Sequence, residues 1–184
     1  MLRKLLILAA ALAVFAVLHE ALHALTAACY GEYRAFHVRP YGLEVVYRTP
    51  VEARRGAHWA LISGLPNLAT VACGYILLAR RTPLAAWRLR AGRALAYWLT
   101  LVFLIGDPLN LSLGPWIYGG DARGIATGLG TSVAVIQAVA FAVVLLNREL
   151  IAQRLLPAYG VAATHPLVKP LVRLPGSRRG AGTA

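Results

Sequence analysis

The sequence predicts an all-α integral membrane protein with about four transmembrane helices, and two observations carry this prediction. First, 59% of the 184 residues are hydrophobic and only 14% are charged, which is more apolar than a soluble globular domain usually is. Second, four apolar stretches are long enough to cross a hydrocarbon core of about 30 Å, which takes roughly 20 helical residues. The stretches are residues 5–28, 59–79, 94–113 and 125–146.

The first apolar stretch has a second interpretation, because a short basic start at residues 1–4 and an apolar run at 5–18 also fit a secretory signal peptide. Thr26, Ala27 and Ala28 would give a passable cleavage site. We expect a retained span, because three ionisable residues come directly after the apolar run. Cleavage would remove them and with them the candidate site that they form.

The connection between the first two stretches can form a short β-hairpin. Residues 36–39 alternate between apolar and polar side chains, and residues 43–45 do the same on the other side of a Pro-Tyr-Gly turn at 40–42, in a segment that runs to Tyr47. A surface loop anchored by arginines is the alternative. We expect the membrane-embedded core to cover residues 1–146 and residues 147–184 to form a basic, Pro/Gly-rich flexible tail.

The formal net charge of +12 indicates contact with anionic lipid headgroups rather than nucleic acid, because the basic residues lie at the ends of the apolar stretches. Cys29 and Cys73 do not indicate a disulfide framework. Lys and Arg are more numerous on the side of the termini, which favours cytoplasmic termini. We expect a multi-pass protein of the cell membrane whose oligomeric state the sequence does not indicate.

Two of the seven carboxylates, Glu20 and Asp107, interrupt apolar stretches. An unpaired carboxylate costs several kcal/mol in hydrocarbon, so an intramembrane one suggests a functional site by default. Glu20 belongs to an H-E-x-x-H motif formed by His19, Glu20 and His23 with Ala21 and Leu22 between them. Three ionisable groups within five residues of an apolar helix therefore mark this segment as a candidate site.

The spacing of the motif suits a zinc peptidase. On an α-helix, positions i and i+4 differ by about 40°, so His19 and His23 share one face and can bind one metal ion. Glu20 lies about 100° round the helix from His19, where it can take a proton from a metal-activated water without being a ligand. A polar cluster that stabilises helix contacts, or a proton relay, is the alternative interpretation.

A catalytic zinc site normally has a third protein ligand, and two aspartates can supply it. His19 lies 14 residues after Leu5, about 21 Å along the helix, and therefore near the far membrane face. The third span ends and the fourth begins at that face. Asp107 is 13 residues into the third span, and Asp121 lies just before the fourth. Both aspartates can reach the metal in this topology.

The pattern resembles the site-2 proteases, a family of intramembrane zinc metalloproteases, over roughly residues 5–146. One feature is the H-E-x-x-H motif, followed by a short Gly-bearing connection at 30–32. Another is Ser-Gly-Leu-Pro-Asn at 63–67, which is similar to the family's Gly-Pro-x-x-Asn segment. The last is the stretch 110–121, with Asn-Leu, Gly-Pro and Gly-Gly-Asp, which is similar to the family's Asn-x-x-Pro stretch leading to an Asp-Gly ligand motif.

The resemblance implies a zinc ion bound by His19, His23 and Asp121, with Glu20 as general base. In this family an edge strand can hold an extended substrate, and an asparagine such as Asn67 can hold its backbone. The sequence departs from the family pattern in three places: Ala122 replaces the glycine after the aspartate, the spacer between Asn110 and the aspartate is longer than in the family, and Leu65 separates the glycine and proline of the second segment. Asp107 is therefore kept as the alternative third ligand. The family places the motif end of the helix near the cytosol, against the charge distribution, so orientation is left open.

The sequence therefore predicts a membrane-embedded zinc endopeptidase that cleaves membrane or membrane-adjacent proteins. The alternatives are a non-proteolytic transporter or metal-binding or proton-binding protein, and an inactive homologue that acts as a scaffold. His37, His58 and His165 have no partner at ligand spacing, and we treat them as interfacial or solvent residues.

Overall fold

The computed structural model describes residues 2–40, 42–118, 120–166 and 168–172. Within them, four helical segments are long and apolar enough to cross a membrane. They are α1 (Leu2–Cys29), α2 (His58–Ala79), α4 (Arg90–Leu113) with the 3-10 turn η2 (Gly114–Trp116), and α6 (Val133–Leu150) with the π-helical turn η3 (Ile151–Leu155) and α7 (Leu156–Ala158). The predicted all-α membrane fold is confirmed.

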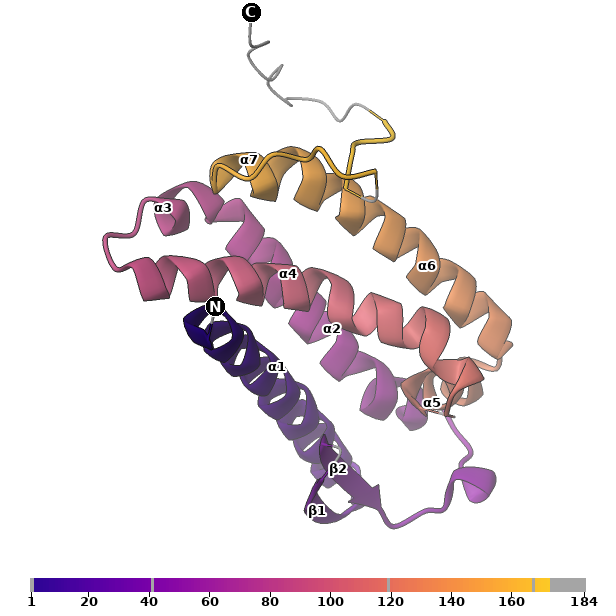
Figure 1. Cartoon of the computed structure of the whole chain (residues 1–184). Helices are drawn as coiled ribbons and strands as arrows, with labels where there is room; N and C mark the ends of the chain where they lie inside the picture. Colours follow the sequence, from indigo (N-terminus) through magenta and orange to yellow (C-terminus); the bar gives the residue numbers. More distant parts are fainter. Residues whose placement is uncertain (1, 41, 119, 167, 173–184) are drawn as a thin grey trace, which may run out of the picture.

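The predicted hairpin between the first two spans is present. Strands β1 (Tyr33–Arg39) and β2 (Gly42–Tyr47) pair antiparallel, with Arg39 opposite Gly42 and Tyr33 opposite Tyr47. A short 3-10 turn, η1 (Val51–Ala53), then leads to α2. Figure 1 shows the hairpin at the end of α1 that lies away from the N-terminus.

The fourth span differs from the prediction, which began it at residue 125. The structure instead has a separate short helix, α5 (Gly120–Leu129), and starts the span at Val133. Gly130 follows the last residue of α5 and ends the helix with a positive φ of 63°. The Ser132 hydroxyl then caps the next helix by accepting from the Val135 amide. Hydropathy alone merged the two helices, because α5 is rich in alanine and glycine.

Helix α5 packs closely against the start of α2. A Cβ atom on Gly124 would lie 1.9 Å from the Ser63 Oγ atom, and one on Gly128 would lie 2.1 Å from the Ala60 nitrogen. Only glycine fits at both positions. These two residues, one turn apart, let the helix axes approach as small residues do in membrane bundles. The close approach holds the first turn of α5 beside α1 and α2.

The helices bury two apolar clusters at opposite ends of the bundle. One lies under the hairpin and consists of Ala27, Trp59 and Ile62, with Tyr33 and Tyr47 of the hairpin packed on it. The other lies at the far end, and its buried members are Leu78, Leu104, Ile151, Leu155 and Leu156. A short helix, α3 (Arg81–Ala85), connects α2 to α4 at that far end. The cluster under the hairpin lies at the same end of the bundle as the histidines of the H-E-x-x-H motif.

Candidate metal centre

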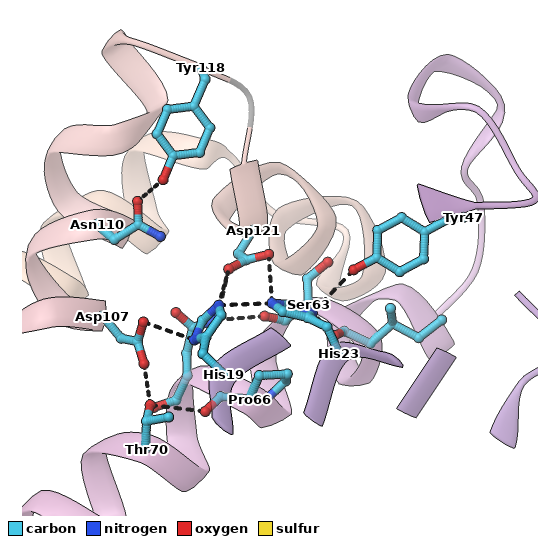
Figure 2. Close-up of polar contacts among 12 residues, drawn as sticks. His19, His23, Tyr47, Ser63, Pro66, Thr70, Asp107, Asn110, Tyr118 and Asp121 are labelled. Atoms are coloured by element: carbon cyan, nitrogen blue, oxygen red, sulfur yellow. Dashed lines mark hydrogen bonds and ion pairs between the residues drawn. The ribbon is translucent and has the colours of Figure 1, made fainter. Parts of the chain in front are cut away.

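The structure brings His19, His23 and Asp121 together at the hairpin end of the bundle. The Nε2 atoms of the two histidines lie 3.0 Å apart. Asp121 places one carboxylate oxygen 3.2 Å from Nε2 of His23 and the other 3.4 Å from Nε2 of His19. Both histidines are buried. Figure 2 shows the two rings and the carboxylate facing one another across helices α1 and α5.

A backbone carbonyl fixes the orientation of the His23 ring. Its Nδ1 atom lies 2.9 Å from the Ile62 carbonyl oxygen, which can only accept a hydrogen bond. That carbonyl is available because residue 66, which would donate to it in a regular helix, is Pro66 and has no N–H. The proton of the neutral ring is therefore on Nδ1, and Nε2 carries a lone pair.

His19 has a carboxylate in the equivalent place. Asp107 Oδ1 lies 3.1 Å from Nδ1 of His19, and the other Asp107 oxygen makes a close hydrogen bond with the Thr70 hydroxyl. Asp107 is 1% exposed. This contact favours a proton on Nδ1 of His19 and again leaves the lone pair on Nε2. Figure 2 shows His19 lying between Asp107 on one side and Asp121 on the other.

Asp121 is oriented from two directions. It lies in the first turn of α5, where the helix N-terminus favours negative charge. Asn67 donates from Nδ2 to Asp121 Oδ2 at 3.1 Å and to the Ser63 carbonyl at 2.7 Å. The carboxyl group is therefore ionised.

The three groups thus present lone pairs to one another and need a positive charge between them. A metal ion fits the donor set, because two imidazoles and a carboxylate are common zinc ligands. It also fits the spacing, since zinc bonds of about 2.0–2.2 Å in a tetrahedron place ligand atoms about 3.3–3.6 Å apart. The separations of 3.0, 3.2 and 3.4 Å are close to this. Among the described residues, these three could hold a metal ion.

The cluster opens into a cavity of about 430 Å³. Glu20 lines this cavity beside both histidines, and the backbone amide of Val45 in β2 donates to its carboxylate. Tyr47 also lines it, with its hydroxyl 3.2 Å from Nδ1 of His23. Asn110 and Tyr118, which hydrogen-bond closely to each other, lie on the opposite wall. Glu20 and the cluster therefore face the same cavity.

The candidate site residues named from the sequence have distinct places in this structure. His19, His23 and Asp121 form the cluster, and Glu20 lies beside it without being part of it. Asp107, the alternative third ligand, faces the Nδ1 side of His19, away from the cluster. Asn67, expected to hold substrate, has its amide nitrogen bonded to Ser63 and Asp121. Asp107 and Asn67 thus contact side chains of the cluster, His19 and Asp121 respectively.

Two contributors were not foreseen from the sequence. The Ile62 carbonyl gives no side-chain signal, although a proline four residues after it in a predicted helix is a usable sign of a free carbonyl. Tyr47 was assigned only to the hairpin. A tyrosine at the last position of a strand that returns toward the motif was the available signal.

No family model, no curated protein and no solved structure matches this chain. The resemblance to the site-2 proteases therefore stays a prediction, and a function for this protein has to be argued from the geometry of the site.

Proposed function

We propose that this protein is a zinc-dependent endopeptidase of the cell membrane that hydrolyses peptide bonds in membrane or membrane-adjacent proteins. The observation that carries the proposal is the convergence of three lone-pair ligands, His19, His23 and Asp121, beside the carboxylate of Glu20 in one accessible cavity. Each imidazole meets an acceptor on its Nδ1 side, which is the arrangement that metal-binding histidines usually have.

The residues have separate roles in the proposed reaction. Zinc, when bound, supplies Lewis acidity that polarises a carbonyl group and acidifies water. Glu20 accepts a proton from the attacking water and returns it to the leaving amine nitrogen. Ile62 and Asp107 hold the two imidazoles in orientation, and Asn67 holds Asp121. The cavity walls admit an extended segment, because a peptide carbonyl inside a helix is already hydrogen-bonded.

The first experiment measures zinc in protein purified in detergent. We expect one zinc per chain, and we expect His19→Ala, His23→Ala and Asp121→Ala each to lose it. His37→Ala, on the hairpin, is the matched histidine control and should keep zinc. Protein without stoichiometric zinc would overturn the enzyme proposal. If Asp107→Ala lost the metal while Asp121→Ala kept it, the assignment of the third ligand would be wrong.

The second experiment measures cleavage. Membranes from cells that express the wild type or Glu20→Gln are compared by mass spectrometry for new protein N-termini. We expect new termini with the wild type only, while Glu20→Gln keeps its zinc. Glu32→Gln is the control, because this carboxylate lies outside the residues that line the cavity and accepts from the amide and hydroxyl of Thr49, which the glutamine oxygen can still do in part. Full zinc loading without any new terminus would favour the non-proteolytic metal-binding alternative.

A further inference from the structure

The hydroxyl of Tyr47 has an unusual hydrogen-bonding position. It lies 3.2 Å from Nδ1 of His23, the same nitrogen that lies 2.9 Å from the Ile62 carbonyl oxygen. Since that carbonyl requires a proton on Nδ1, the nitrogen has no lone pair to offer Tyr47. The phenol oxygen is therefore an acceptor in this contact, and its own proton is left for another partner.

That proton has no acceptor among the hydrogen bonds of the described residues. The hydroxyl lies at the wall of the cavity that Glu20, His19 and Asp121 also line. A tyrosine phenol is neutral at neutral pH and can donate a hydrogen bond. Tyr47 therefore gives the cavity a neutral O–H donor beside the candidate metal cluster.

Two side chains pack against the ring of Tyr47 and strand pairing holds its backbone, so the donor is fixed in place. It packs on Trp59 with ring centroids 5.5 Å apart at 81°, an edge-to-face contact. The guanidinium of Arg54 lies 4.8 Å from the Tyr47 ring and 4.3 Å from the Trp59 ring. Cross-strand pairing with Tyr33 fixes the backbone. A preorganised donor of this kind is what stabilises developing charge in acyl transfer.

We propose that Tyr47 is a catalytic hydrogen-bond donor, whose hydroxyl binds the carbonyl oxygen of the scissile peptide bond as negative charge develops on it. The proposal rests on the proposed peptidase function. The water oxygen bonds to the carbonyl carbon, its proton passes to Glu20, and the π electrons move to the oxygen that Tyr47 binds. When the carbonyl reforms, the carbon–nitrogen bond breaks and Glu20 protonates the amine.

The test compares Tyr47→Phe with the matched control Tyr33→Phe, which removes the hydroxyl of the residue opposite Tyr47 on the same hairpin. Two probes are titrated into zinc-loaded protein in detergent. One is an N-protected leucyl-leucine phosphinic isostere, whose tetrahedral anion mimics the charged state, and the other is the corresponding leucyl-leucine amide. Zinc content is measured alongside, so that the readout does not depend on activity.

We expect Tyr47→Phe to keep one zinc, to bind the amide as the wild type does, and to bind the phosphinic isostere about 10 to 100-fold more weakly. Tyr33→Phe should change neither affinity by more than about twofold. On a cleaved substrate, kcat should fall about 100 to 1,000-fold with little change in KM.

Three results would overturn the inference. Equal phosphinic-isostere affinity in Tyr47→Phe and the wild type would remove Tyr47 from the chemistry while leaving the proposed function intact. Loss of zinc from Tyr47→Phe would assign the hydroxyl to support of His23 instead. A zinc-loaded wild type that binds the isostere no better than the amide would count against Tyr47 and the peptidase function together.

Discussion

Two membrane helices of this protein contain an internal proline, and the carbonyl that each proline frees has a different partner. In α2, Pro66 leaves the Ile62 carbonyl without its helical donor, and Nδ1 of His23 lies 2.9 Å from it. In α4, Pro108 leaves the Leu104 carbonyl free, and Asn147 of α6 donates to it at 2.6 Å. The same backbone feature serves the candidate metal centre at one point and the packing of the bundle at the other.

The second carbonyl belongs to a buried connection among three spans. Asn147 is fully buried, donates to the Leu104 carbonyl in α4, and accepts from the Tyr75 hydroxyl in α2 at 2.6 Å. Among the described residues, the cluster that could hold a metal ion does not include Asn147, Leu104 or Tyr75. The role of a proline inside a membrane helix therefore depends on which donor binds the carbonyl that the proline leaves free. Changes at the Asn147 connection should affect stability, and changes at the His23 contact should affect metal binding.

The largest expected effect is on stability, from Asn147→Leu. This change leaves the Leu104 carbonyl and the Tyr75 hydroxyl without their partner, and each unsatisfied group costs about 1–3 kcal/mol, so we expect a loss of roughly 2–6 kcal/mol in the free energy of unfolding. Thermal denaturation in detergent measures it. Gln137 lies in the same helix and donates one hydrogen bond, to the Ser112 carbonyl. Gln137→Leu should therefore lower the free energy of unfolding by less than Asn147→Leu does. Weaker zinc binding by folded Asn147→Leu would contradict the separation of the two regions.

Pro66→Ala should affect zinc binding most among the proline changes. It restores an N–H that competes with His23 for the Ile62 carbonyl, so the ring loses the acceptor that orients it. We expect zinc affinity to fall about 10 to 100-fold, as when the supporting partner of a metal-binding histidine is removed. The helix itself should not lose stability, because alanine is the better helix former. Competition with a zinc chelator measures the affinity, and unchanged affinity would show that the carbonyl does not orient His23.

The fold and the position of the motif could be predicted from the sequence because both depend on local pattern. Hydropathy marked the four spans, and helical spacing placed His19 and His23 on one face at the depth that Asp121 reaches. The predicted start of the fourth span was wrong, because average hydropathy does not detect the helix end at Gly130 or the helix cap at Ser132. The Gly124 and Gly128 contacts that place Asp121 depend on tertiary packing, which no single segment encodes. The contacts of Asp107 with His19 and of Asn67 with Asp121 also depend on tertiary packing.

Asp107→Asn tests whether His19 needs a carboxylate beside its Nδ1 atom, since His23 has a neutral backbone carbonyl in the same position. The asparagine can still accept from Nδ1 of His19 and contact Thr70, but the negative charge that strengthens the ring as a ligand is lost. We expect about a tenfold loss of zinc affinity, at the lower end of the range for such partners. Glu32→Gln, which also removes one carboxylate charge but lies outside the cavity and the contacts of His19, serves as the reference. A complete loss of zinc would instead make Asp107 a ligand.

The smallest expected effect is that of Pro108→Ala on zinc. The new N–H competes with Asn147 for the Leu104 carbonyl, which loosens α6 from α4 but leaves the acceptors of both histidines unchanged. We expect zinc affinity within about twofold of the wild type, because independent sites rarely couple more strongly than a few tenths of a kcal/mol. The same chelator competition measures it. Since Pro108 directly follows Asp107, a loss as large as that of Pro66→Ala would mean that the proline also sets the direction of the Asp107 carboxylate. The two prolines would then both serve the metal centre, one through a carbonyl and the other through its neighbour.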